Sequence, residues 1–376
     1  MPAPQSLVTL CVASTALFAG NCMVPIAFKQ LMGLVPAEHQ QLWAVLHPVH
    51  GIIVYSLILI VFRRAALPSL RSFNPLLALP VSLLFGIYNA MKASVGKSVP
   101  GTVQLLLDQL APLGVMTLCV GLRLTTSGSD GSEHGIWRGF SRFAAAKEYR
   151  PLHVLSALVL IAGTVAYAAL ELTSAATSTQ PAANGAGATD GMALFVCAAK
   201  LVPFCVGFVY VEFVLQVVHP HLFPTVMWWW ICAFQMVVAL ATSACSLEAL
   251  RAGVSCFWFG HDYAPASAAS GDRVPQVACA PLTPLLNFVG AGGSSLVNIA
   301  IPLVARHGSS ALVTLIRGAS LPVVSLLFSY ERFGGERLDA KVGTGVACAT
   351  LAVALWAVAG GRAAAAQQGG VAKKLD

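Results

Sequence analysis

The chain has 376 residues, of which 57% are hydrophobic and only 10% are charged, against roughly 25% charged in an ordinary soluble domain. So few charged groups cannot cover a surface that faces water, so the composition excludes an ordinary soluble protein. The net charge of +7 is better explained by membrane topology than by nucleic-acid binding, because the basic residues gather on one predicted face of the membrane.

Ten apolar runs follow one another along the chain, each long enough to cross about 30 Å of hydrocarbon. Runs of this length satisfy their backbone hydrogen bonds in lipid only as helices. The sequence therefore predicts an all-α, polytopic membrane protein with ten transmembrane helices. They are Leu7–Ala27, Leu42–Phe62, Pro75–Ala93, Val99–Leu122, Pro151–Leu170, Gly191–Leu215, Pro224–Ala244, Pro281–Val304, Ser309–Phe328 and Ala340–Gly360.

The first run also allows a second interpretation, a cleaved signal peptide, because small residues at 16–20 follow an apolar stretch. Against it, no Lys or Arg precedes the run, which continues unbroken to Ala27. Between the fourth and fifth runs, Ile136, Phe140 and Phe143 share a helical stripe flanked by basic residues. That tract is typical of a helix on the inner leaflet, and a solvated loop is the alternative.

Charge predicts the orientation, because excess Lys and Arg mark the cytosolic side. Placing both termini in the cytosol puts most loop cations on that side and most acids on the other. The cytosolic cations are then Arg63, Arg64, Arg71, Arg123, Arg138, Arg142, Lys147, Arg150, Arg306, Arg362, Lys373 and Lys374. We expect a multi-pass membrane protein with both termini in the cytosol.

A shift of 210 residues aligns Val103 with Val313, Leu105 with Leu315 and Pro112 with Pro322. Five helices per half make such a repeat inverted, the usual architecture of secondary transporters. The predicted organisation is a first half at 1–170, a non-cytosolic linker at 171–190, a second half at 191–362 with a non-cytosolic loop at 245–280, and a cytosolic tail at 363–376. Pro112 and Pro322 each remove a helical hydrogen bond, so they are candidate hinges.

Four ionisable residues lie inside the predicted spans, each at a cost of a few kcal/mol at mid-bilayer. They are Asp108, Lys200, Glu212 and Arg317. We expect them to face a cavity or one another, and a purely structural salt bridge is the alternative. Neutral partners for a substrate in the same cavity are Asn21, Asn89, Gln104 and Asn298, and Gln104 shares a helix face with Asp108.

The sequence contains no HExxH, GxSxG or Walker A motif, and it predicts neither an enzyme nor a cofactor. His47 with His50, and His219 with His221, have few acidic or Cys neighbours, so no metal site is predicted. Most of the ten cysteines lie in apolar runs, where they act as small apolar residues. Cys256 and Cys279 share the non-cytosolic loop, where an oxidising compartment favours a disulfide; two free thiols are the alternative.

Five stretches resemble the chloroquine resistance transporter-like family of the drug/metabolite transporter superfamily. They are RSFNPLLAL, QLLLDQLAPLGVM, LVPFCVGFVYVEFVLQ, GVSCFWFG and LVNIAIPLVARHGSSALVTLIRGASLP, in that order. In the third stretch, Pro203, Cys205 and Glu212 match the family pattern. Cys256 and Cys279 match two of its lumenal loop cysteines.

The resemblance implies two inverted five-helix halves around a central cavity, cytosolic termini, and export of peptides, amino acids, thiols or drug-like solutes, often driven by protons. The chain departs from the pattern around Leu84 and Ser294, where family members can carry acids. It also departs at Asp108, where family members usually carry an apolar residue, and at Arg317, where they usually carry a neutral polar residue. These departures leave the charge of the substrate open.

The sequence allows two alternative functions. An anion exchanger for phosphorylated metabolites or nucleotide sugars would use Lys200 and Arg317 to hold a phosphate. A non-transporting receptor or scaffold is the alternative from another class. The predicted partners are a small-molecule substrate, protons and the lipid bilayer, with no nucleic acid and the oligomeric state open.

Asp108 and Arg317 lie one residue out of register in the repeat alignment, at similar predicted depth. If they interact, Asp108→Asn and Arg317→Gln should each impair folding or transport, and the charge-swapped double variant should recover part of the loss. Thermal unfolding of the purified variants measures this coupling. Fully additive losses in the double-mutant cycle would mean that the two side chains do not interact.

Overall fold

The computed structural model describes residues 4–35, 42–95, 98–99, 101–108, 110–126, 136–145, 151–177, 191–242, 247–260, 280–307 and 310–328, together with 343–358 except 349, 353, 356 and 357. All the regular elements in these ranges are helices, with no strand among them. The predicted all-α class is confirmed for this part of the chain.

The described residues of the first half of the chain form ten helical elements. They are α1 (Pro4–Leu34), α3 (Leu42–Phe62), η1 (Arg64–Ala66), α4 (Leu67–Ser72), η2 (Pro75–Leu77), α5 (Leu79–Val95), α6 (Gly101–Asp108), α7 (Ala111–Thr126), α8 (Ile136–Ala145) and α9 (Pro151–Thr177). The second half continues with α10 (Gly191–Ala199), α11 (Leu201–Phe213), η3 (Val214–Val218), α12 (Pro224–Thr242), α13 (Leu247–Val254), η4 (Ser255–Phe259), α14 (Thr283–His307) and α15 (Ser310–Phe328). Of the short elements, η3 and η4 are π-helices.

Seven of the described helices or helix pairs are long and apolar enough to cross a membrane, which is compatible with a multi-pass membrane protein. They are Val8–Leu34, Val45–Phe62, Pro75–Val95, Leu106–Leu124, Gly191–Val218, Pro224–Ala241 and Thr283–Val304. Each overlaps a predicted span. The other three predicted spans overlap α9, α15 and the helical residues after 342, and they stay predictions.

The chain divides into two compact units, which interleave pieces of both predicted halves. Unit 1 comprises Met1–Cys22, Thr102–Thr189 and Ile299–Asp376, and unit 2 comprises Met23–Gly101 and Asp190–Asn298. The unit boundaries fall inside α1 and α14, so each of these helices contributes to both units.

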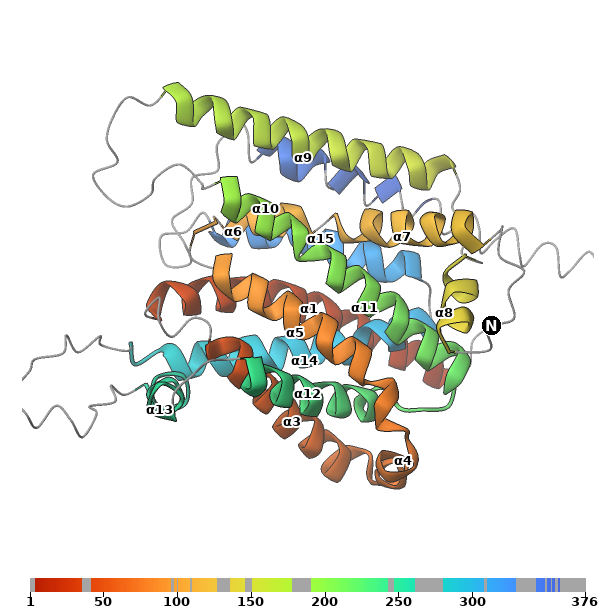
Figure 1. Ribbon diagram of the computed structural model, residues 1–376. Coiled ribbons are helices and arrows are strands. Elements are labelled where there is room, and N and C mark those ends of the chain that lie inside the picture. Colours follow the sequence, from red (N-terminus) through yellow and green to blue (C-terminus); the bar gives the residue numbers. More distant parts are fainter. Residues whose placement is uncertain are drawn as a thin grey trace, which may run out of the picture. The chain divides into compact units, whose positions relative to one another are not determined.

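In unit 2, α5 packs against α3, α10, α11 and α12, and α12 also packs along α3 (Figure 1). Phe85 of α5 stacks on Trp228 of α12, with ring centroids 5.5 Å apart. Large apolar side chains remain exposed along the same helices, among them Leu57, Val61, Phe195 and Val202. A helix that is apolar on its inner and outer faces is typical of a membrane span.

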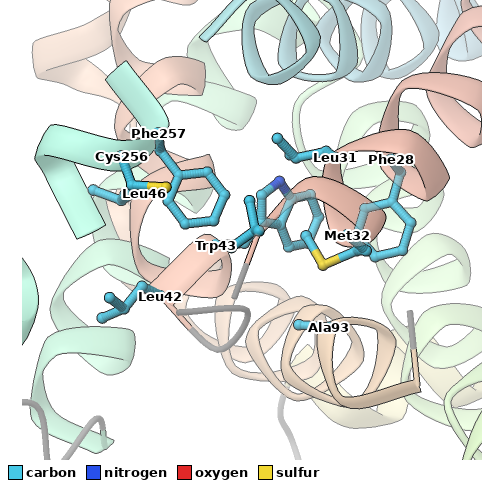
Figure 2. Packing of buried hydrophobic residues seen from close by; sticks show 10 residues of the cluster. Phe28, Leu31, Met32, Leu42, Trp43, Leu46, Ala93, Cys256 and Phe257 are labelled. Carbon is cyan, nitrogen blue, oxygen red and sulfur yellow. The ribbon is translucent and has the colours of Figure 1, made fainter. Parts of the chain in front are cut away.

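One end of unit 2 is closed by a buried cluster, the aromatic cluster, drawn from α1, α3, α5 and η4. Its members are Phe28, Leu31, Met32, Val35, Leu42, Trp43, Leu46, Ala93, Cys256 and Phe257. Figure 2 shows Cys256 and Phe257 next to Leu46, with Trp43 and Phe28 on the side of α1. Phe28 and Trp43 meet edge to face at 4.9 Å, a geometry that adds to the energy of burial. The cluster anchors η4 to the membrane helices.

In unit 1, α8 packs against α7. Phe140 and Ala144 are the buried residues of α8, while Trp137 is exposed. The structure therefore places Phe140, which the sequence assigned to a membrane-facing stripe, against protein. Elsewhere in the unit, the Ser156 hydroxyl of α9 donates to the carbonyl of Ala352.

Close packing of α3 on α12 depends on Gly51, because a Cβ atom there would lie 2.5 Å from Sγ of Cys232. We expect Gly51→Ala to destabilise the protein by about 1–3 kcal/mol, the usual cost of overpacking. The double variant Gly51→Ala/Cys232→Ala should recover stability, because it removes the opposing thiol. Thermal unfolding in detergent measures both.

Gly86→Ala is the matched control for this experiment. It lies in α5, and a Cβ atom there would meet the nearest side chain at an ordinary 3.9 Å from Val238. An equal loss of stability in Gly51→Ala and Gly86→Ala would contradict the role assigned to Gly51.

Candidate functional site

The membrane span Gly191–Val218 is interrupted at Lys200. Helix α10 ends at Ala199 and α11 begins at Leu201, although the Lys200 N–H still donates to the carbonyl of Val196 at 3.0 Å. Pro203 explains the position of the break, because it has no N–H for the carbonyl four residues earlier, that of Ala199. The Lys200 side chain is 0% exposed. A cationic side chain is thus buried next to Ala199, whose carbonyl cannot accept from Pro203, while the backbone at Lys200 itself keeps helical angles of φ −57° and ψ −22°.

A second irregularity lies in unit 1 at the turn from Leu107 to Leu110, of which residue 109 lies outside the described residues. Helix α6 ends at Asp108 and α7 begins at Ala111, and the N–H of Leu110 donates to Leu107 at 2.9 Å in a tighter turn. The chain has a proline, Pro112, four residues after Asp108, which again removes the donor for the carbonyl at the helix end. The Asp108 side chain is half-buried, with Oδ1 buried.

Proline alone does not account for these breaks. Pro25, Pro48 and Pro302 also lie inside α1, α3 and α14, and each of those helices is continuous. The two breaks share a further feature, which is a charged residue. Asp108 ends one helix, and Lys200 separates two others. Irregular backbone at membrane depth is tolerated only where it is buried in protein or lines a water-filled cavity. Such breaks are the usual places where transporters bind solutes and ions.

Three other predicted site residues belong to unit 2. Asn89 of α5 is buried, 8% exposed. The amide of Asn298 on α14 donates to the hydroxyl of Tyr55 on α3 at 3.4 Å. Glu212, half-buried near the end of α11, accepts a hydrogen bond from the Gln216 amide at 3.3 Å. The sequence did not identify Tyr55 as a site residue, because an aromatic residue within an apolar span is ordinarily read as another hydrophobic residue of that span.

The remaining predicted residues belong to unit 1. The amide of Asn21 donates to the carbonyl of Leu17 in its own helix at 2.9 Å. Gln104 is buried in α6, one turn before Asp108. Arg317 is half-buried in α15, and Pro322 lies further along the same, continuous helix. The interaction of Asp108 with Arg317 stays a prediction.

The loop cysteines are described only in part. Cys256 lies in η4 and is buried in the aromatic cluster, whereas Cys279 lies outside the described residues. The predicted bridge between them is untested. The free thiols in the described ranges are Cys11, Cys22, Cys119, Cys197, Cys205, Cys232 and Cys348.

Comparison of the sequence with family models and with curated proteins returned no match. The resemblance to the chloroquine resistance transporter-like family therefore stands on the quoted sequence stretches alone. The geometry of the two helix breaks is independent of that resemblance.

If Pro203 sets the break in unit 2, Pro203→Ala should restore a donor for the Ala199 carbonyl and join α10 to α11. We expect amide hydrogen exchange across residues 199–203 to slow by about fivefold to tenfold, the effect of one added buried hydrogen bond. Mass spectrometry of the protein in nanodiscs measures it. Pro48→Ala, in a continuous helix, is the control, and unchanged exchange in Pro203→Ala would contradict the explanation.

Proposed function

We propose that this protein is a secondary transporter that moves small organic solutes across an internal membrane. The observation that supports the proposal most directly is the pair of interrupted spans, one in each compact unit, with Asp108 at one break and Lys200 at the other. Buried charges in spans are costly, at about 2.5–3.5 kcal/mol each on insertion scales, and such residues usually mark a solute pathway. Breaks in membrane helices are also common binding places for solutes and ions in transporters.

The family resemblance agrees with this proposal and extends it. It implies ten helices in two inverted five-helix halves, cytosolic termini, residence in a vacuole or another endomembrane, and transport driven by protons. In this proposal, Asn89 and Asn298 of unit 2 supply neutral hydrogen bonds to the substrate.

An anion exchanger is the second candidate, and the complete burial of Lys200 favours it, because a buried cation suits a phosphate or carboxylate group. Substrate charge separates the two candidates. A receptor or scaffold without transport activity predicts that removing the intramembrane charges leaves function intact.

The proposal is tested by uptake of a mixed metabolite pool into proteoliposomes, with and without a pH gradient, read by mass spectrometry. Lys200→Gln and Asp108→Asn should each reduce uptake at least tenfold, on the order of the loss of one charge-assisted contact. Arg142→Gln, on the exposed face of α8, is the control and should transport normally. Wild-type uptake in both charge variants, or no uptake by the wild type, would overturn the proposal.

Glu212 is the residue we expect to couple transport to protons. It is the acid within a span that also matches the family pattern, and it accepts a hydrogen bond from the Gln216 amide. Glu212→Gln mimics the protonated side chain, so substrate counterflow should survive while proton-driven accumulation disappears. Unchanged accumulation across a pH gradient would show instead that Glu212 is a solvated residue at the helix end.

A further inference from the structure

His50 of α3 is a buried histidine whose two ring nitrogens both have defined partners. The residue is 1% exposed. Its Nδ1 lies 3.1 Å from the carbonyl of Leu46, and its Nε2 lies 3.2 Å from the amide nitrogen of Asn287 on α14. A carbonyl only accepts, so Nδ1 carries the proton. Nε2 must then accept from the Asn287 amide, and the imidazole is neutral.

The orientation of the Asn287 amide is fixed by a second bond. Its nitrogen also donates to the backbone carbonyl of Phe257 in η4, at 3.2 Å. Both donor hydrogens are therefore used, one on His50 and one on Phe257. The Oδ1 atom of Asn287 is buried and has no hydrogen-bond partner among the described residues. Asn287 can thus donate to both His50 and η4 only while Nε2 of His50 is unprotonated and accepts a hydrogen bond.

We propose that His50 and Asn287 form a proton-binding site that releases η4 when it is occupied. A proton on Nε2 turns this nitrogen into a donor that faces the amide hydrogen with which Asn287 bonded it. The only acceptor that Asn287 can present is Oδ1, which reaches Nε2 if the amide rotates by half a turn. Rotation carries the amide nitrogen away from Phe257, so the hydrogen bond to η4 is lost.

The surroundings of His50 transmit this change to η4. The His50 ring packs against Trp258 of η4 and Phe288 of α14, each at 4.9 Å between centroids. Leu46 and Phe257, whose carbonyls accept the two outer bonds, are neighbours in the aromatic cluster (Figure 2). At its far end η4 stops at Gly260, whose φ of +66° suits a residue without a Cβ atom. The hydrogen bond from Asn287 is thus a polar tether between η4 and α14.

The titratable and charged neighbours come from α3, α5 and α12. On α3 itself the nearest is His47, which stacks on Trp43 at 4.5 Å. Lys92 of α5 lies over the Phe28 ring at 4.3 Å, and Cys232 of α12 faces the neighbouring Gly51. The described part of α14 adds the neutral Asn287 and Phe288. None of these side chains is a carboxylate that would hold the proton in place of His50.

The test uses amide hydrogen exchange of the full-length protein in nanodiscs, corrected for the intrinsic effect of pH. Between about pH 8 and pH 5, where an imidazole ordinarily changes charge, exchange of residues 255–260 should become about fivefold to tenfold faster. His50→Gln should abolish this pH response, and the matched control His47→Gln should keep it. Asn287→Leu should give fast exchange at both pH values.

Nitrogen-15 NMR of labelled histidine supplies a readout that does not depend on exchange. The signal absent from His50→Gln is that of His50, and it should change from the Nδ1–H tautomer to the doubly protonated ring over the same range. A neutral His50 at about pH 5, or an intact pH response in His50→Gln, would overturn the proposal. These measurements involve no transport, so their failure leaves the proposed transport function untouched.

Discussion

The structure depends on one constraint, that hydrocarbon offers a polypeptide no hydrogen-bond partner. Each backbone group within a span must therefore be satisfied by its own helix or by neighbouring protein. Most described spans meet this requirement as continuous helices, even where α1, α3 and α14 contain a proline. The helix assignment is interrupted at Asp108 and at Lys200, and each position adds the cost of a charged side chain. The proposed binding of a polar solute would give a reason to maintain both.

Within unit 2, the helices are held together by close packing of small and aromatic side chains. Hydrophobicity alone contributes little to association of helices in lipid, because lipid tails are as apolar as the side chains. Two contacts instead depend on complementary shapes. They are the close approach of Cys232 to Gly51 and the stacking of Phe85 on Trp228. This specificity explains how a chain with exposed apolar surface throughout can still form defined helix pairs.

Buried polar side chains of unit 2 occur in small, local groups rather than in one continuous array. Tyr55 pairs with Asn298, and His50 pairs with Asn287. Both pairs join α3 to α14, so two polar contacts, five residues apart on α3 and eleven residues apart on α14, link the same two helices. In an apolar medium, separating either pair costs free energy, because it leaves a buried donor or acceptor unsatisfied. A change of protonation at one such pair therefore has a structural consequence.

The sequence by itself determined the helical class and the position of seven spans, because length and hydropathy are local properties of the chain. It also singled out Asp108 and Lys200, since a charge in an apolar run is visible without a structure. Only the tertiary structure decided which prolines interrupt a helix, because Pro48 and Pro203 look alike in sequence. It also decided the partners of His50 and Tyr55, which lie 237 and 243 residues away along the chain. Pairing over such separations depends on how helices pack, and hydropathy does not record it.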